Sequence, residues 1–307
     1  MKPQNIFVVG ECMIELRRAN TGLTYRFGGD TLNAAVYLSR LINRKDFEVA
    51  YVTALGVDSL SEEMNAGWEN EGINTSWVQR LPDKLPGMYL IETDAAGERR
   101  FHYWRSDSAA RYWLQGDRAE QVCDALANSP FVYLSGISLA ILSPSHREIL
   151  LSTLTECRSR GGKIIFDNNY RPRLWQCADT ASDMYRRILS LTDIALLTLD
   201  DEDALYGKAD VATVIERTRA LGVAEVVIKR SAASCIVEAD GRLVEVTPQQ
   251  VASVVDTTAA GDSFGAAYVA ARLAGRTPEQ AAHAGHRLAA AVIQIPGAII
   301  PLEKMPK

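Results

Sequence analysis

One stretch of the sequence places two aspartates around a run of small residues, Asp256-Thr257-Thr258-Ala259-Ala260-Gly261-Asp262. A helical pattern follows directly, so backbone N–H groups of the small residues would lie at the positive end of a helix dipole, where anions bind. Asp262 puts a carboxylate at this anion site. It could cap the helix, as aspartates commonly do, or it could act as a general base beside a phosphate that it helps to transfer. The local pattern alone favours the cap.

The composition is that of a globular protein. The 307 residues have room for one large α/β domain, and 47% hydrophobic with 23% charged residues is ordinary for such a domain. A net charge of −5 argues against binding to nucleic acid. There is no apolar run of membrane-spanning length and no signal-peptide pattern. Five scattered cysteines without metal-ligand spacing suggest free thiols. We therefore expect a cytoplasmic protein with no membrane contact.

Strand and helix patterns alternate along most of the chain. Apolar, strand-like runs are separated by helix-sized segments, and they cover residues 6–9, 48–54, 131–134, 163–166, 194–197 and 225–228. This alternation predicts a mostly parallel sheet flanked by helices, that is, an α/β fold. The runs at 234–238 and 243–246 predict an antiparallel hairpin at the edge of the sheet.

Two segments, about 13–27 and 86–105, have a different character. They contain short extended runs, and Asp94-Ala95-Ala96-Gly97 suits a hairpin turn between two of them. We expect both segments to form a small antiparallel β lid within one domain that covers residues 1–307. The lid face that carries Tyr89, Ile91, Phe101 and Tyr103 is expected to be the outer face, and its apolar character predicts a homodimer joined through the lids.

Polar residues gather where the predicted strands end. They occur at 167–171, 200–203 and 229–231, and Gly28-Gly29-Asp30 opens an early helix. In open parallel sheets, ligands bind beyond the carboxyl ends of the strands, so these segments are expected to share one site. The sequence has neither a P-loop nor a G-x-G-x-x-G motif. The helix that contains Asp262 is therefore the candidate phosphate cradle.

These motifs resemble those of the ribokinase-like (PfkB) carbohydrate kinases. The 256–262 stretch is similar to the family's D-T-x-G-A-G-D motif, and residues 28–33 are similar to its G-G-x-x-x-N motif. The resemblance extends from about residue 5 to residue 301 and includes the β lid. Segments 10–15, 101–105, 166–175 and 297–301 resemble, more narrowly, the members of the family that phosphorylate a keto sugar acid. With this resemblance, Asp262 is interpreted as the catalytic base.

The resemblance also implies a set of site residues. ATP would donate the phosphoryl group with Mg²⁺ bound to its phosphates, and N–H groups of Ala259, Ala260 and Gly261 would stabilise the charge that develops during transfer. Two arginines would bind a substrate carboxylate. The implied substrate residues are Gly28, Gly29, Asp30, Asn33, Tyr89, Tyr103, Arg105, Arg171 and Asp262. The implied ATP residues are Asn169, Lys229, Arg230, Ser231 and Ser234, together with the three anion-site residues.

Two positions depart from the family pattern. Ala259 stands where the family has glycine, so we expect the turn to avoid a left-handed conformation there. Asp200 and Asp203 stand in place of an N-x-x-E motif; they could order Mg²⁺ through water, or they could simply be acids in the first turn of a helix. Two other functions stay open at this stage: a sister kinase that acts on a neutral sugar such as fructose or ribose, and a sugar or nucleotide sensor without catalysis.

Overall fold

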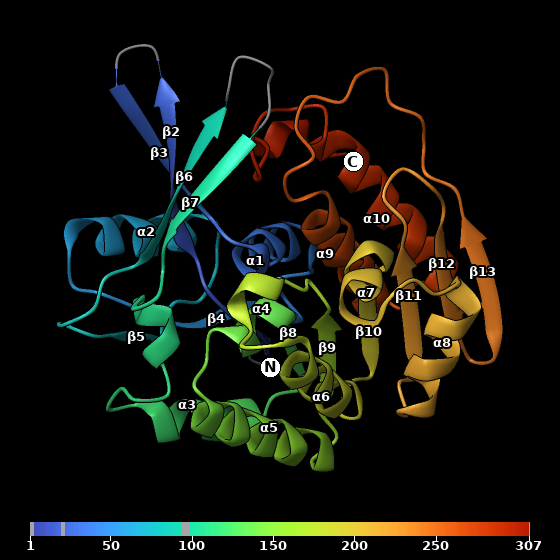
Figure 1. The fold of residues 1–307 in the computed structure, drawn as a ribbon, viewed down its shortest axis with the longest axis horizontal. Coiled ribbons are helices and arrows are strands. Elements are labelled where there is room, and N and C mark those ends of the chain that lie inside the picture. Colours follow the sequence, from blue (N-terminus) through green and yellow to red (C-terminus); the bar gives the residue numbers. More distant parts are fainter. Residues whose placement is uncertain (1–2, 20–21, 94–98, 307) are drawn as a thin grey trace.

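A nine-stranded sheet forms the centre of the computed structural model, which describes residues 3–19, 22–93 and 99–306 (Figure 1). The strand order is β13-β12-β11-β10-β9-β8-β1-β4-β5, and all pairings from β5 to β11 are parallel. β12 and β13 form the predicted antiparallel edge hairpin. The strands are β1 (Gln4–Val9), β4 (Phe47–Leu55), β5 (Val78–Arg80), β8 (Phe131–Ser135), β9 (Lys163–Asp167), β10 (Ile194–Thr198), β11 (Glu225–Lys229), β12 (Cys235–Ala239) and β13 (Arg242–Val246).

Helices cover both faces of this sheet, which confirms the predicted α/β architecture. Side chains alternate between the faces: Ile6 and Val8 of β1 pack with α1 and α9, whereas Phe7 and Val9 pack with α3, α5 and α6. One layer contains α1 (Asp30–Leu41), α2 (Ser59–Asn70), α9 (Ala260–Leu273) and α10 (Pro278–Val292). The other contains α3 (Ala119–Ala127), α5 (Pro144–Ser159), α6 (Ala178–Leu189) and α8 (Val211–Ala220). The shorter α4 (Gly136–Ala140) and α7 (Leu199–Tyr206) follow β8 and β10 directly.

The second sheet is the lid, which projects away from the main sheet (Figure 1). Its order is β3-β2-β6-β7, formed by β2 (Met13–Ala19), β3 (Gly22–Gly28), β6 (Gly87–Thr93) and β7 (Arg99–Trp104). The two outer pairings are antiparallel, as expected, but the central pairing of β2 with β6 is parallel. The turn predicted at 94–97 lies outside the described residues.

The register of the lid determines which of its faces meets the rest of the protein. Residues directly opposite one another in a sheet share a face, and Tyr89 lies opposite both Glu15 and Tyr103. Arg17 is on the same face, and its guanidinium lies 3.7 Å from the Asp256 carboxylate. The prediction that this is the outer face is therefore wrong, because the face carrying Tyr89 and Tyr103 is turned toward the helix that carries Asp262.

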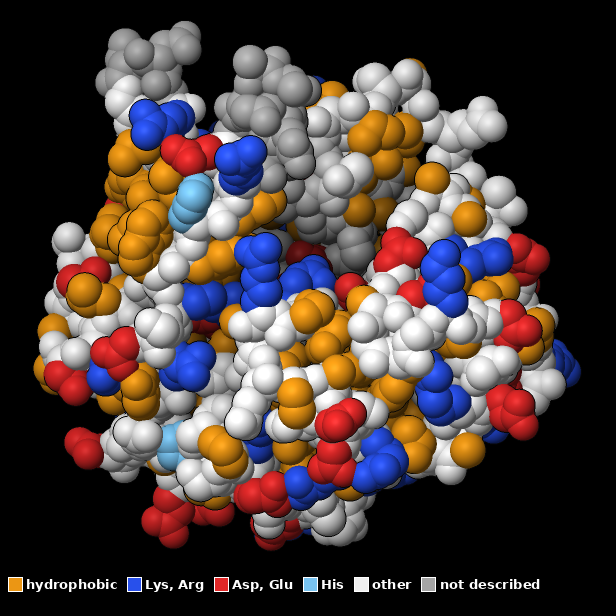
Figure 2. Space-filling model, in the orientation of Figure 1, with side chains coloured by type: hydrophobic (Ala, Val, Ile, Leu, Met, Phe, Trp, Pro, Cys, Tyr) orange, Lys and Arg blue, Asp and Glu red, His pale blue; other side chains and the backbone are white. Residues whose placement is uncertain are grey.

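The opposite lid face also carries large exposed apolar side chains, in addition to Phe101 and Tyr103 on the inner face, which are 42% and 48% exposed. Leu23 is 60% exposed, Tyr25 47% and Trp104 57%. Hydrophobic side chains are visible over this part of the lid in Figure 2. Among the residues described, no helix is long and apolar enough to cross a membrane.

The backbone at Ala259 differs from the sequence expectation. Ala259 precedes α9 with φ 61° and ψ 15°, in the left-handed region that the sequence analysis expected it to avoid. Ser231 also has a positive φ, 50°. An L-residue in this region costs about 1–2 kcal/mol. The expectation failed because the geometry of the loop, and not the residue type, determines the conformation at this position.

We expect Ala259→Gly to raise the free energy of unfolding by roughly 0.5–1 kcal/mol, since glycine relieves the strain but has a more flexible unfolded state. Thermal or urea unfolding measures this change. The matched control is Ala290→Gly within the right-handed helix α10, which should lower stability by about 1 kcal/mol. Equal losses in the two variants would contradict the assigned strain.

Candidate active site

The centre of the site is the first turn of α9. Asp262 is the third residue of this helix, and its carboxylate oxygen Oδ2 accepts a hydrogen bond of 2.8 Å from Asn33 Nδ2 of α1. The two helices pack side by side (Figure 1). The structure thus brings together one residue from each sequence motif. Asn33 belongs to the 28–33 motif and Asp262 to the 256–262 motif, and they are 229 positions apart in the chain.

Two glycines allow α1 to approach this position. A side chain on Gly10, directly after β1, would place its Cβ 2.1 Å from Thr31 Oγ1, and one on Gly29 would place its Cβ 2.3 Å from the Glu11 carbonyl oxygen. Both contacts are far too short for any carbon atom. The loop after β1 can therefore pack against the start of α1 only with glycine at these positions, and this packing places Asp30 and Asn33 at the carboxyl ends of the strands.

Asp30 is held by the loop that follows β9. Its carboxylate accepts a hydrogen bond of 2.6 Å from Asn169 Nδ2. Asn169 has φ 26°, and its backbone is supported by the fully buried Asn168, whose side-chain oxygen accepts from the N–H groups of Asn169 and Thr198. Tyr185 donates to the Asn168 carbonyl oxygen. Asn169, which was predicted to bind ATP, thus contacts Asp30, which was predicted to bind the substrate.

A buried ion pair lies beside the anion site. Lys229, at the end of β11, donates to Asp167 Oδ2 at 2.7 Å, and both side chains are more than nine-tenths buried. A Cβ on Gly261 would be 3.6 Å from the Lys229 ammonium. The lysine therefore supplies positive charge next to the backbone of the first turn of α9, where a transferred phosphoryl group would carry negative charge.

These surroundings raise the pKa of Asp262 to about 7, first because the carboxylate is buried and then because the carboxylate of Asp30 is near. The hydrogen bond from Asn33 opposes this rise, Asp167 adds to it, and Lys229 reduces it. Burial also raises the pKa of Asp167 itself. A carboxylate with a pKa near the operating pH is well matched to accept a proton in a general-base step.

The lid supplies aromatic side chains next to this centre. The Tyr89 hydroxyl donates to Glu15 at 2.6 Å, and its ring centroid is 5.8 Å from that of Tyr103. A Cβ on Gly28 would lie 3.4 Å from the Tyr89 hydroxyl. The structure therefore brings together three predicted substrate residues, Gly28, Tyr89 and Tyr103, on the inner side of the lid.

The two predicted carboxylate-binding arginines are in different surroundings. Arg105 is only 9% exposed; its Nη2 donates to the fully buried Glu11, which also accepts from Ser108. Within the described residues, Arg105 Nε is buried and has no hydrogen-bond partner. Arg171 is half exposed and donates to Asp201 at 3.2 Å. Arg105 is therefore a buried cation with one unused donor, whereas Arg171 is half exposed and bonds to Asp201 and to the Tyr170 carbonyl oxygen.

The residues predicted at the nucleotide have mixed contacts. Arg230 and Ser234 both bond to Glu245, on the edge hairpin. The Ser231 hydroxyl is 3.4 Å from Asp200, whereas the Asp203 carboxylate accepts from the backbone N–H of Ala209 just beyond its own helix. The described residues contain no group of three or more His, Cys, Asp or Glu side chains that could hold a metal ion.

Three buried carboxylates at the site had no role assigned from the sequence. Glu11 and Glu15 hold Arg105 and Tyr89, and Asp167 holds Lys229. The sequence contained a recognisable signal for each of these three carboxylates. Glu11 and Glu15 are acids in an otherwise apolar run, and Asp167 is the last residue of a buried strand. Acids in such places are rare unless they are paired.

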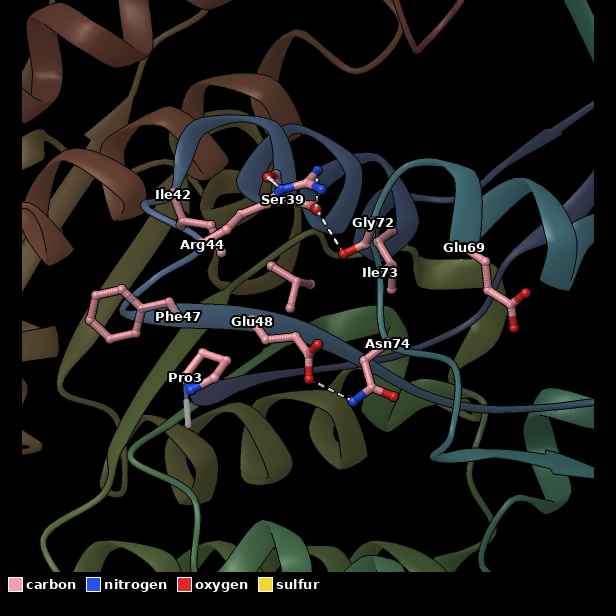
Figure 3. Close-up of a pocket in the computed structure, with 11 residues that line it drawn as sticks. Pro3, Ser39, Ile42, Arg44, Phe47, Glu48, Glu69, Gly72, Ile73 and Asn74 are labelled. Atoms are coloured by element: carbon pink, nitrogen blue, oxygen red, sulfur yellow. Dashed lines mark hydrogen bonds between the residues drawn. The ribbon is translucent and has the colours of Figure 1, made fainter. Parts of the chain in front are cut away.

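A separate hollow of about 390 Å³ lies at the opposite end of the strands of the main sheet (Figure 3). Pro3, Phe47 and Glu48 line it at the amino ends of β1 and β4, whereas the site above lies at the carboxyl ends. Its polar side chains are paired with the protein: Glu48 with Asn74, and Arg44 with Ser39. This hollow is not part of the candidate active site.

The α/β fold, with a buried carboxylate in the first turn of α9, is typical of phosphotransferases of the ribokinase-like class. A model of the pfkB family of carbohydrate kinases matches residues 3–305, and the chain belongs to this family. It is 54% identical to a 2-dehydro-3-deoxygluconokinase of Dickeya dadantii, over 100% of both chains, and 53% identical to one of Escherichia coli, over 99% of both. An E. coli structure of a putative ribokinase II with ATP and Mg²⁺ has a TM-score of 0.82 at 21% identity, covering 99% of this chain and 96% of its own.

The raised pKa of Asp262 predicts the pH dependence of activity. A general base at Asp262 would have to be unprotonated, so kcat/KM for phosphorylation should fall about tenfold per pH unit below about 7. Asp262→Asn should lower kcat at least about a hundredfold, and Glu279→Gln, an exposed acid on α10, should leave the profile unchanged. A wild-type profile that is flat from pH 5 to 8, or near-normal turnover of the asparagine variant, would refute the role of base.

The raised pKa of Asp262 also predicts that the stability of the folded protein falls as the pH rises, whereas the activity is predicted to rise. Because the folded-state pKa of Asp262 lies above its unfolded value of about 3.9, the folded protein holds an extra proton between about pH 4 and 7, and its stability falls as the pH rises through this range. Asp262→Asn escapes this loss. Its unfolding free energy relative to wild type should therefore increase from pH 4 to 7, by up to about 4 kcal/mol, since a pKa difference of one unit corresponds to about 1.4 kcal/mol.

Proposed function

We propose that the protein phosphorylates the 6-hydroxyl of 2-keto-3-deoxy-D-gluconate with ATP, giving 2-keto-3-deoxy-6-phosphogluconate and ADP. The observation that carries the phosphoryl transfer is the Asp262 carboxylate, bonded to Asn33 in the first turn of α9 and with a raised pKa. The sugar acid is supported by the full-length relatives at 53–54% identity, whose name specifies this substrate.

In this reaction Asp262 accepts the proton of the 6-hydroxyl as that oxygen attacks the γ-phosphorus of ATP. A new P–O bond forms to the sugar, and the bond from the γ-phosphorus to the β–γ bridging oxygen breaks as ADP leaves. Backbone N–H groups of Ala259, Ala260 and Gly261 stabilise the transferring group; that of Ala260 donates to the Thr257 carbonyl oxygen at 3.2 Å in this structure and would be shared with the phosphoryl oxygen. Lys229 adds positive charge beside Gly261. Asp30 and Asn33 bind the sugar hydroxyls and keep the attacking oxygen in line.

Mg²⁺ would bind mainly to the ATP phosphates. The described residues contain no protein cage for a metal ion, and Mg²⁺ is commonly held by nucleotide phosphates, water and one or two carboxylates. Asp200 and Asp203 remain the proposed carboxylates. Asp200 is the better candidate, because it contacts Ser231 of the predicted nucleotide segment, whereas Asp203 bonds to the backbone N–H of Ala209 beyond its own helix. The bound ion would neutralise charge on the phosphates.

Arg105 is proposed to bind the substrate carboxylate at the end remote from the reacting hydroxyl, with Arg171 as a second donor. A buried donor without a partner is costly unless a ligand occupies it, and Arg105 Nε is such a donor among the described residues. This feature favours the sugar acid over a neutral sugar. An intact base and anion site disfavour a sensor without catalysis. We also propose a cytoplasmic location, which is supported by the free cysteines of the described chain and by the use of ATP.

The substrate proposal predicts different effects of the arginines on two substrates. Arg105→Ala would leave Glu11 buried and unpaired, so we choose Arg105→Lys, which keeps the charge but lacks the Nε–H donor. It should reduce kcat/KM for the sugar acid by roughly ten- to a hundredfold. Any weak activity on fructose, which has no carboxylate, should barely change. An ADP-release assay on both substrates measures the two ratios.

Arg171→Ala should act in the same direction, and Arg173→Ala, an exposed arginine two residues further along, is the matched control without effect. Equal losses on the two substrates would make the arginines structural. A wild-type preference for fructose would instead favour the sister-kinase alternative.

We also propose a homodimer joined through the exposed faces of the two lids. The supporting observation is the exposed apolar side chains of that face, Leu23, Tyr25 and Trp104, on a sheet that projects from the body of the protein (Figure 1). Exposed apolar patches on soluble proteins commonly mark contact surfaces. A second copy of this chain offers an identical, self-complementary patch, as a two-fold dimer requires.

Leu23→Glu should convert the dimer into a monomer, because it places a charge in the proposed apolar contact while changing a side chain that is 60% exposed in one chain. Light scattering at micromolar concentration measures the mass. Leu243→Glu, at a leucine that is 64% exposed on the edge strand β13, is the control that should remain dimeric. A strictly monomeric wild type would contradict the proposed dimer.

A further inference from the structure

Arg17 is a lid residue that no step above uses. It projects from β2 on the inner lid face, and its Nε donates to Glu15 at 2.5 Å. Its Nη2 is buried, lacks a hydrogen-bond partner among the described residues, and lies 3.7 Å from Asp256 Oδ2. Arg18, the next residue, points to the other face, where it pairs with Glu92. Arg17 thus links the lid to the loop that precedes α9.

Asp256 is the residue that fixes the shape of this loop. Its Oδ1 accepts hydrogen bonds from the N–H and the hydroxyl of Thr258, at 3.1 and 2.6 Å, and its Oδ2 accepts from the Gly297 N–H at 3.0 Å. Asp256 is only 3% exposed. One carboxylate therefore joins the loop, the segment near the C-terminus and the Arg17 guanidinium of the lid.

This loop needs support because it holds a strained residue. Ala259, immediately after Thr258, has a left-handed backbone, and such a conformation persists only where the surrounding contacts over-determine it. The N–H groups that would face the transferred phosphate follow directly. A small displacement of the loop would move these donors away from the positions where charge develops.

A continuous chain of contacts connects the substrate side of the lid to this loop. Tyr89 donates to Glu15, Glu15 accepts from Arg17, and Arg17 faces Asp256, which holds Thr258. Each of these side chains is buried or partly buried, so the charges interact more strongly than they would in water. The Tyr89 end lies beside Gly28, among the proposed substrate residues, and the Thr258 end leads into the anion site.

We infer that Arg17 is a positioning residue for phosphoryl transfer: through Asp256 it sets the position of the anion-site N–H groups, and it does so from the lid that covers the sugar. The inference rests on the phosphoryl transfer proposed above and adds a residue to it. Arg17 does not touch the reacting atoms. It acts by making the geometry of the 256–261 loop depend on the placement of the lid.

The test is Arg17→Met, which keeps much of the side-chain length and removes the charge. We expect kcat for the sugar acid to fall about tenfold, with KM changed less than about twofold, because the loss affects the transition state and not ground-state binding. Arg17→Lys keeps the charge and should recover part of kcat; it also serves as the second variant if the methionine variant folds poorly. Arg18→Met, the same change on the opposite lid face, should keep wild-type kcat at an unchanged oligomeric state.

A double-mutant cycle with Asp256→Asn separates positioning from a general structural effect. In the Asp256→Asn background, Arg17→Met should cost less than about twofold in kcat, because its partner has already been changed. Independent, multiplying losses would overturn the inference, as would a loss confined to KM or a kcat equal to that of Arg18→Met. If the wild type does not phosphorylate the sugar acid, the proposed function fails instead, and the cycle is run on the sugar that a substrate panel identifies.

Discussion

The convergence of buried carboxylates at the carboxyl ends of the strands is the constraint on which the rest of the site depends. Asp262, Asp30 and Asp167 lie close enough for each of the other two to raise the pKa of Asp262. Like charges in a buried site are unfavourable unless donors compensate them. The structure supplies Asn33 to Asp262, Asn169 to Asp30 and Lys229 to Asp167. The remaining imbalance raises the pKa of both Asp167 and Asp262, and Asp262 is the group proposed to accept a proton.

The same compensation explains why so many elements meet at one place. The donors come from α1, from the loop after β9 and from the end of β11, and each is fixed by its own backbone contacts. Gly10 and Gly29 allow α1 to approach, and Asn168 holds the strained Asn169. The lid contributes a second set of buried pairs, Glu11 with Arg105 and Glu15 with Arg17. Catalytic geometry in this protein is therefore a consequence of paired charges in low dielectric, where an unpaired partner would be costly.

Much of the fold and part of the site could be predicted from the sequence, because both are encoded locally. The alternation of apolar runs and helix-sized segments defined the parallel sheet. Local pairs such as Ser143-Pro144 and Thr277-Pro278, which are typical of helix starts, lie at the beginnings of α5 and α10. The 256–262 stretch and residues 28–33 indicated the family, because a phosphate-binding turn requires small residues at fixed spacing. The sequence alone also placed Asp262 at the start of its helix.

Only the tertiary structure decided what depends on residues distant in the chain. The inner and outer lid faces follow from the parallel pairing of β2 with β6, which local alternation cannot reveal. Arg105 is buried because Glu11, 94 positions away, pairs with it, whereas Arg171 stays exposed. The left-handed backbone of Ala259 is imposed by the loop that Asp256 anchors, against the preference of alanine. Residue types and spacing specify which chemistry is available; pairing, burial and charge across the fold determine which residue carries it.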